Sequence, residues 1–239
     1  MNKSDSLGDR MKAFEAISNA KLIPKVPAII RFDGRSFSNF TKGMSKPWDM
    51  GFVATMQDTT VKLCENIQGA IFGYCQSDEI SILLIDWQGY DTTKWFDGKI
   101  QKICSVGAGI ATAYFNDILK GRFENWWGNG VFDARVFNIP EHDIVNNFLW
   151  RQQDCERNSV QMLARAHFSH SQCHNKNCNE LQDMLMTEKE VNWNDIPTHL
   201  KRGTAVVRKP EGWKIDEEMP ILSQDRDYIN IPRLFENEE

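Results

Sequence analysis

Apolar residues recur along this chain with two periods, and the alternation of these periods predicts a protein of mixed strands and helices. Continuous β-branched runs bounded by turn residues indicate strands, and apolar residues three or four positions apart indicate helices. In chain order, the pattern predicts a strand at 26–32, a helix at 47–66, strands at 70–75 and 79–85, a helix at 99–116 and a strand at 130–139. Only a few polar residues separate the second and third strands, which indicates a hairpin.

This order of elements, β-α-β-β-α-β, is that of a ferredoxin-like split unit. It predicts an α+β fold of the polymerase-palm type, in which two helices cover one face of an antiparallel sheet. After Pro140 the pattern becomes helical, with segments at 144–167 and 181–187 and a last strand at 204–208. We therefore expect a palm-like catalytic domain over 1–140 and a mainly helical extension over 141–239 that packs on the palm and is not independent.

The two ends of the chain have patterns of their own. An opening helix is predicted over 4–19, with Ser6 as its N-cap. The apolar positions of this helix are Leu7, Met11, Phe14 and Ile17. The acidic residues 236–239 are expected to form a frayed tail.

Two carboxylates are predicted to meet at one edge of the sheet. Asp33 ends the first strand and Asp78 lies in the hairpin, and these places are neighbours in a split β-α-β-β-α-β sheet. Adjacent carboxylates repel one another unless a cation lies between them, and hard oxygen ligands suit Mg²⁺. Two such ions roughly 3.5 to 4 Å apart stabilise the attacking and leaving oxygens in phosphoryl transfer. The pair therefore predicts a two-metal site of the polymerase-palm kind.

Residues beside this pair are suited to binding phosphates. Gly34 lets the backbone approach a ligand, and the amides of 34–37 are predicted to form a nest for an anion. Lys46 and Lys102 are candidates to neutralise a triphosphate. Asp-Gly and Ser-Asp-Glu runs are also common in turns, so the joint placement of the two motifs carries the prediction.

Composition and charge narrow the class of protein. The 239 residues carry 28 Lys and Arg against 33 Asp and Glu, a formal charge of -5, and 41% are hydrophobic, which excludes a disordered or collagen-like chain. The net negative charge argues against a nucleic-acid partner, but an enzyme that uses Mg²⁺ needs carboxylates at its centre. The basic stretch at 201–214 is compatible either with contact to an RNA backbone or with a solvated surface. Short apolar runs, a polar N-terminus and six cysteines without a CxxC pair predict a cytoplasmic protein with reduced thiols and no membrane partner.

Seven short motifs occur in order over most of the chain. They are LGDRMK at 7–12, RFDGRSF at 31–37, KP at 46–47, QSDEIS at 76–81, FDARV at 132–136, WRQQDC at 150–155 and KRGT at 201–204. In this order they resemble the motifs of the histidine-tRNA guanylyltransferase family. The resemblance implies a palm-type fold and the addition of nucleotides to the 5′ end of an RNA in the 3′-to-5′ direction. The 5′-phosphate is activated with ATP, or a triphosphate is used, and the 3′-hydroxyl of an incoming GTP or other nucleotide attacks it.

The resemblance also implies roles for individual residues. Asp33, the carbonyl of Gly34 and Asp78 hold two Mg²⁺ ions, and Glu79 supports this catalytic carboxylate shell. The nucleotide is implied to contact Asp33, Gly34, Arg35, Ser36, Phe37, Ser38, Lys46, Ser77, Asp78 and Lys102. A homotetramer, arranged as a dimer of dimers, is implied as well, because one tRNA must reach a palm and a neighbouring subunit.

The run after Cys155 departs from the eukaryotic pattern of the family, His-Ile-Asn-Asn-Leu-Tyr-Asn, of whose polar residues only Asn158 remains. In this the chain is similar to the bacterial, archaeal and phage-type members, which repair 5′-truncated tRNAs by template-directed addition. Strict addition of a single G to histidine tRNA is the alternative, and a tRNA-binding module without activity is an alternative of another class.

Contacts with RNA are expected from two parts of the chain. Arg151, Asp154 and Asn158 share one helix face, which suits either nucleotide or RNA positioning or a solvated, ion-paired face. The later candidates for RNA contact are Lys201, Arg202 and Lys209.

Three further patterns are weaker. His167, His170, Cys173, His174 and Cys178 match no standard zinc spacing, so an incidental polar segment is favoured over a metal site. Trp126-Trp127 is expected to pack against the sheet edge rather than to stack on a base. A nucleotidyl cyclase is disfavoured because its hairpin carries a Gly-Gly-Asp/Glu-Glu/Asp-Phe motif, and this hairpin reads Gln-Ser-Asp-Glu.

Overall fold

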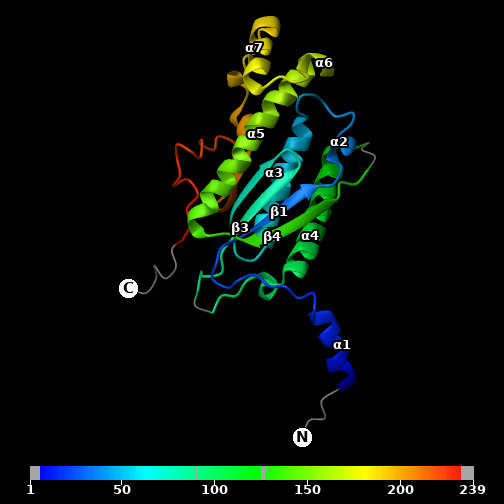
Figure 1. Ribbon diagram of the computed structural model, residues 1–239, viewed down its shortest axis with the longest axis vertical. Coiled ribbons are helices and arrows are strands. Elements are labelled where there is room, and N and C mark those ends of the chain that lie inside the picture. Colours follow the sequence, from blue (N-terminus) through cyan, green and yellow to red (C-terminus); the bar gives the residue numbers. More distant parts are fainter. Residues whose placement is uncertain (1–5, 90, 125–127, 233–239) are drawn as a thin grey trace.

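The computed structural model describes residues 6–89, 91–124 and 128–232. Within these ranges, six strands form one antiparallel sheet in the order β4-β1-β3-β2-β5-β6 (Figure 1). The strands are β1 (Ala28–Gly34), β2 (Ala70–Gln76), β3 (Glu79–Leu84), β4 (Phe132–Asn138), β5 (Thr204–Lys209) and β6 (Gly212–Asp216). Trp126-Trp127 and the acidic tail lie outside the described residues.

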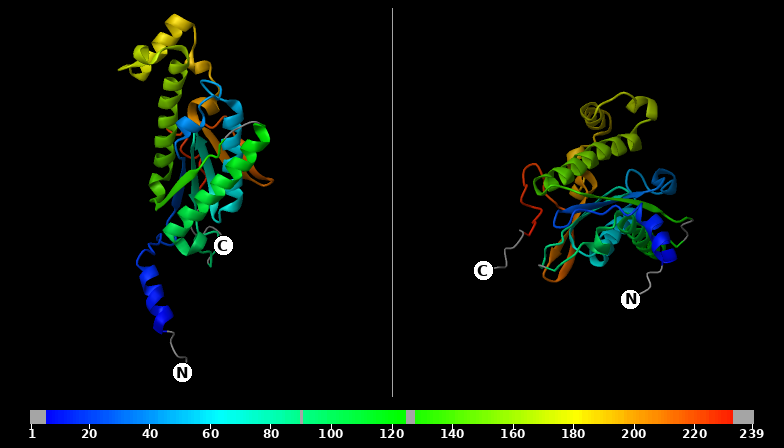
Figure 2. Two further views of the ribbon diagram at one scale, coloured as in Figure 1. Left: turned by 90° about the vertical axis from the view of Figure 1, so that its right-hand side faces the viewer. Right: turned by 60° about the horizontal axis from the view of Figure 1, so that its bottom comes forward.

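Helices cover both faces of this sheet. The α-helices are α1 (Ser6–Ala16), α2 (Phe37–Phe40), α3 (Met50–Asn66), α4 (Ile100–Arg122), α5 (Ile144–His167), α6 (His170–Cys173), α7 (Cys178–Lys189) and α8 (Thr198–Arg202). Short 3-10 turns are η1 (Trp95–Gly98), η2 (Glu141–Asp143) and η3 (Trp193–Asp195). Helices α3 and α4 pack on one face and α5 crosses the other, so the sheet lies between two helical layers (Figure 2).

The predicted α+β palm is confirmed, because β1, α3, β2, β3, α4 and β4 follow one another in the β-α-β-β-α-β order. Within the palm, two helix ends differ from the prediction by three residues or more. Helix α3 begins at Met50 rather than at Pro47, because the Asp49 side chain caps it by accepting a hydrogen bond from the amide of Phe52. Helix α4 continues to Arg122, since Leu119 remains buried in the core.

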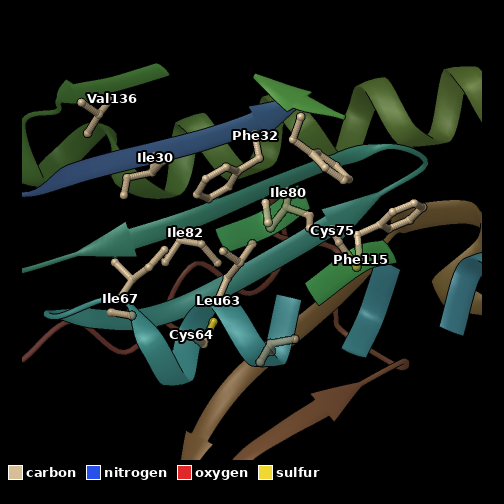
Figure 3. Close-up of a cluster of buried hydrophobic side chains, with 14 of the residues drawn as sticks. Ile30, Phe32, Leu63, Cys64, Ile67, Cys75, Ile80, Ile82, Phe115 and Val136 are labelled. Carbon is tan, nitrogen blue, oxygen red and sulfur yellow. The ribbon is translucent and has the colours of Figure 1, made fainter. Parts of the chain in front are cut away.

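The core positions the central strands. Ile30, Phe32, Ile80 and Ile82 lie fully buried against α3 and α4, where Phe115 packs among them (Figure 3). The intervening residues of the same strands face α5 instead. Because side chains alternate along a strand and both faces are covered, β1 and β3 are mostly apolar in the sequence, with Arg31 and Ser81 as the polar residues inside them.

The C-terminal segment contributes to the same sheet. β5 pairs with β2, with Tyr74 opposite Ala205, and β6 pairs with β5. The strand expected at 204–208 is therefore present, whereas β6 was not predicted, because only Trp213 and Ile215 mark it among polar residues. The segment expected to be mainly helical thus supplies two of the strands, and its division from 1–140 as a separate unit stays a prediction.

Helix α1 lies apart from the rest of the fold (Figure 1). Its apolar side chains stay in solvent, with Leu7 59% and Phe14 64% exposed. Ser6 is the first residue of the helix rather than its N-cap, and Ile17 follows its end. Searched over its described residues, the chain contains no helix that combines the length and the apolar character needed to cross a membrane.

Candidate active site

Asp33 and Asp78 meet at the edge of the sheet where β1 ends. β1 and β3 pair antiparallel, and Asp33 lies opposite Glu79. Beyond this pair, the amide of Gly34 donates a hydrogen bond of 3.0 Å to the carbonyl of Asp78. The first strand and the hairpin are therefore joined directly at the two acidic residues.

The hairpin turn holds Ser77 in an unusual conformation. Gln76 pairs with Glu79, which leaves Ser77 and Asp78 as a two-residue turn. Such turns need a positive φ at their first central residue, and Ser77 has a φ of 47°. Ser36, across the site, has a φ of 57°. Residues other than glycine in this region are strained, and they concentrate at ligand sites.

Gly34 is required by packing. A Cβ atom at this position would lie 2.1 Å from the ring of Phe37. Phe37 is buried among aromatic rings, and those of Phe40 and Phe132 have centroids 4.9 and 5.1 Å away. This anchor holds the segment after β1 in place and leaves Ser36 and Ser38 exposed at the edge of the site.

The phosphate nest expected from the amides of 34–37 is wrong in part. The Gly34 amide donates to Asp78, and the Arg35 amide donates 2.8 Å to the carbonyl of Val131. Both donors are used because β1 pairs with neighbouring chain on each side. They cannot also serve as the phosphate cradle.

A cavity of about 400 Å³ opens beside the carboxylates. Its polar wall includes Ser36, Ser38, Lys46, Ser77 and Asp78. Its apolar wall includes Met44, Trp48, Phe52, Met162 and Leu200. The size and the mixed lining are those of a small-ligand site.

Two carboxyls at this edge have raised pKa values. Burial raises the pKa of Asp78 above its ordinary value, and the neighbouring carboxylate of Asp33 contributes to the rise. No ion pair to Asp78 occurs in the described part of the chain, and the nearest guanidinium to Asp33 is that of Arg135, at 3.9 Å. The carboxylates of Asp33 and Asp78 with the carbonyl of Gly34 form a hard-oxygen donor set with unbalanced negative charge, which fits Mg²⁺.

Glu79 is held inside the protein by arginines. Arg151 on α5 donates from Nη1 to Glu79 Oε2 at 3.0 Å, and Arg31 Nε lies 4.0 Å from the same oxygen. Burial raises the pKa of Glu79, although these guanidinium groups act in the opposite direction. Arg151, expected to contact RNA, therefore lies buried as a support for Glu79.

The structure brings some of the remaining candidates to the cavity and leaves others elsewhere. Asn158 on α5 lines it, and Arg35 lies exposed beside it. Lys102 lies in the first turn of α4, whose start bonds to Ala20, before β1, so it is at the opposite end of the sheet. Its nucleotide contact stays a prediction.

The basic candidates of the C-terminal segment are mostly engaged within the fold. Lys201 is buried and donates to the carbonyl of Asn194 at 2.7 Å. Arg202 donates to Glu156 at 2.9 Å. Lys209 lies exposed at the end of β5. Their RNA contacts stay predictions, and only Lys209 among them presents its side chain to solvent.

Sequence reasoning missed the inner wall of the cavity. Gln57 and His199 line it together with Thr204, and the Gln57 side chain donates to the Thr204 hydroxyl at 3.1 Å. These residues come from α3, α8 and β5, and no local motif joins them. The available signal was the polar character of the inner face of α3, where Gln57 is buried together with Thr55, Thr59 and Thr60.

The His and Cys residues of 167–178 do not gather into a site. His170 and His174 stack with ring centroids 5.8 Å apart. Over the described ranges, no group of three or more His, Cys, Asp or Glu side chains is placed to hold a metal ion.

A palm-like sheet with paired carboxylates at one edge, beside a cavity of nucleotide size, is the arrangement of a nucleotidyltransferase. A family model described as tRNAHis guanylyltransferase matches residues 8–140, more than half of the chain. The chain belongs to this family, and the resemblance found in its motifs is confirmed.

Solved structures and curated relatives agree with this assignment. A bacterial tRNA(His) guanylyltransferase (Thg1)-like protein in complex with ATP is 42% identical, with a TM-score of 0.90 over 94% of this chain and 97% of that chain. A protein of the same description in complex with GTP is 37% identical, with a TM-score of 0.82 and the same coverage. The tRNA(His) guanylyltransferase of Schizosaccharomyces pombe is 24% identical over 222 residues, 87% of this chain and 81% of the relative. The predicted similarity to bacterial members matches the first two.

Proposed function

We propose that this protein adds nucleotides to the 5′ end of tRNA in the 3′-to-5′ direction, guided by a template, and so repairs 5′-truncated tRNAs. The observation that carries the proposal is the meeting of Asp33 and Asp78 beside a 400 Å³ cavity with serine hydroxyls and a lysine on its wall. The ATP and GTP in the structures of the bacterial relatives support a nucleotide in this cavity.

In this proposal Asp33, the carbonyl of Gly34 and Asp78 hold two Mg²⁺ ions. When bound, the ions stabilise negative charge on the attacking and leaving oxygens of phosphoryl transfer. The hydroxyl of Ser77 and the ammonium of Lys46 hold phosphates at the polar wall, and the apolar wall receives the base. The 3′-hydroxyl of the incoming nucleotide then forms a bond to the activated 5′-phosphorus, and the activating group leaves.

The segment after Cys155 supports templated addition over addition of a single G. In place of the eukaryotic run, Glu156 pairs with Arg202, and the hydroxyl of Ser159 accepts a hydrogen bond of 2.9 Å from the Trp193 ring nitrogen. These residues hold α8 and η3 against α5. Their side chains are therefore engaged within the fold, and Ser159 in addition lines the cavity.

Purified protein with Mg²⁺, ATP and all four nucleoside triphosphates is expected to extend a 5′-monophosphorylated tRNA that lacks its first nucleotide. Sequencing the 5′ ends of the products measures the outcome, and changing the opposite base should change the added nucleotide. Addition of G alone, whatever the opposite base, would indicate the strict guanylyltransferase. Absence of extension, with tRNA binding retained in an Asp33→Ala and Asp78→Ala double variant, would indicate a binding module.

Replacing Ser77 with Gly is expected to weaken ATP binding about tenfold, the effect of one hydrogen bond to a charged group. Glycine adopts the positive φ of Ser77 without strain, so the loss reports the hydroxyl and not the turn. Isothermal titration measures the affinity. Asn175→Gly is the matched control, because Asn175 has a φ of 59° and does not line the cavity. Equal ATP affinity in wild type and Ser77→Gly would remove Ser77 from the phosphate site.

We also propose that the protein forms a homotetramer, as the family resemblance implies. Helix α1 supports assembly, because Leu7, Met11 and Phe14 form an apolar stripe that nothing in the described chain covers. Phe14→Asp is expected to lower the mass measured by light scattering. Met186→Asp changes a similarly exposed residue on α7 and should leave the mass unchanged. A monomeric mass for the wild type would contradict the proposal.

A further inference from the structure

An exposed tryptophan lies close to the carboxylates on the sheet face that α5 crosses. Trp150 on α5 is 50% exposed. The guanidinium carbon of Arg151 lies 3.6 Å from the centroid of its ring, and that of Arg31 lies 5.7 Å away. Arg31 is two residues before Asp33 on the same side of β1, about 7 Å along the strand. The ring therefore lies one or two side chains from the candidate metal site.

The sheet is open beside this ring. Helix α5 directs Phe148 and Cys155 into the fold. It covers the end of β4, where Phe137 packs, but leaves the beginning of this strand uncovered on this face (Figure 1). On β4, Asp133 and Arg135 are accordingly exposed, and Arg135 lies directly opposite Arg31 in the register. An uncovered strip therefore runs from the Trp150 ring past Arg135 to Asp33. Its Arg135 guanidinium is half exposed. It lies 3.4 Å from Asp133 and 3.9 Å from Asp33, and its exposed side is suited to a phosphate of a nucleic-acid backbone.

The ring is fixed in place, as a stacking surface must be. Arg151 stacks on it while its Nη1 holds Glu79 and lies 3.4 Å from Asp154. A guanidinium that is buried and bonded at its far side cannot follow a moving ring, so it holds one side of the ring still. The exposed half of Trp150 is then an aromatic surface that loses little side-chain conformational entropy when a ligand binds to it.

We propose that Trp150 is the stacking surface for the base of the 5′-terminal nucleotide of the RNA substrate. The inference rests on the proposed function, since it takes an RNA with its 5′-phosphate at Asp33 and Asp78. ATP does not fit this role, because the nucleotide cavity is lined from α3, the α2 segment and the other side of α5, and Trp150 is not part of its wall. RNA bases are recognised by stacking of their free faces on aromatic side chains, and the 5′-terminal base of a truncated tRNA has one free face because no nucleotide precedes it.

The test measures binding of two RNAs and of ATP to the full-length protein. The RNAs are a 5′-monophosphorylated tRNA lacking its first nucleotide and the same molecule with an abasic 5′-terminal residue. Trp150→Ala is expected to bind the intact RNA roughly five- to a hundredfold more weakly, the range for loss of one base stack. Its affinity for ATP should not change, and Trp150→Phe should keep most of the RNA affinity. Met186→Ala is the control for loss of an exposed apolar side chain.

The abasic RNA separates stacking from support of Arg151. If the ring stacks on the base, wild type and Trp150→Ala bind the abasic RNA equally. If the ring only supports Arg151, the variant loses affinity for both RNAs by the same factor and for ATP as well, which would overturn the inference. Wild-type extension of the intact RNA together with unchanged RNA affinity in Trp150→Ala would overturn the inference alone. Absence of RNA binding by the wild type would overturn the proposed function with it.

Discussion

Asp78→Asn is expected to lower the rate of nucleotide addition about a thousandfold and at the same time to stabilise the fold. The loss corresponds to several kcal/mol of charge stabilisation in the transition state, since the amide no longer holds a cation. The fold becomes more stable because burial and the Asp33 carboxylate disfavour a negative charge at this position, and the amide carries none. We therefore expect the free energy of unfolding of Asp78→Asn at neutral pH to exceed that of the wild type. Single-turnover kinetics and urea unfolding measure the two effects.

The sign of the pH dependence follows from the raised pKa of Asp78. A carboxyl with a higher pKa in the folded chain binds its proton more tightly there, so it stabilises the fold at low pH and loses this contribution as the pH rises through the folded pKa. Asn cannot titrate. The stability difference between Asp78→Asn and wild type should therefore be largest at neutral pH and shrink on acidification through the raised pKa. Wild-type activity should decline over the same acidic range.

Asp58→Asn is the matched control for both measurements. Asp58 lies on the outer side of α3, partly exposed, in a surface ion pair with Arg122. It should alter stability by less than about 1 kcal/mol and leave activity intact. An Asp78→Asn variant that stays active would show that Asp78 does not hold a metal ion. One that is inactive and also less stable would contradict the argument from burial.

Arg151→Met is expected to lower the free energy of unfolding by about 3 kcal/mol, because it leaves the buried carboxylate of Glu79 without its nearest cation. This value is the lower end of the range of about 3 to 5 kcal/mol for removing one partner of a buried ion pair, because Arg31 remains 4.0 Å from Glu79. Arg157→Met is the control on the same helix. Arg157 pairs with Asp154 at the surface, and its loss should cost less than about 1 kcal/mol. Urea unfolding of both variants makes the comparison.

A double variant tests the cause of this loss. Glu79→Gln removes the charge that Arg151 balances, so adding it to Arg151→Met should recover part of the lost stability. The destabilisation by Arg151→Met should also diminish at acidic pH, because the pKa of Glu79, already raised by burial, rises further when the guanidinium is removed. Additive losses in the double variant would show that the two side chains are not coupled.

The palm and its central acidic residues were predictable from the sequence for a physical reason. β1 and β3 are covered on both faces, so they appear as apolar runs with a single polar residue inside each, Arg31 and Ser81. The acidic residues at the end of β1 and at the start of β3 therefore stand out. Antiparallel pairing of neighbouring strands in the split order then places Asp33 and Asp78 together without further information.

The roles of other residues depended on contacts that spacing does not encode. Arg151 has the motif position of a ligand contact, yet it is buried because Glu79 on β3 faces α5. Trp150, the preceding residue, is half exposed, whereas Arg151 is buried. The motif around the two residues does not show which of them faces solvent. The apolar stripe of α1 has ordinary helical spacing, although nothing in the described chain packs on it. Residue spacing shows which side chains share a helix face, but the residues that this face contacts depend on the tertiary structure.

The pairing of β5 with β2 has a consequence for synthesis of the chain. β2 is synthesised early, but the strand that covers its free edge is encoded about half the protein later. Until β5 leaves the ribosome, β2 presents unpaired backbone groups, and such edges recruit strands from other chains. The cavity also lacks His199 and Thr204 until then. A nascent palm is therefore exposed to aggregation and without a complete nucleotide cavity until its last third has been made.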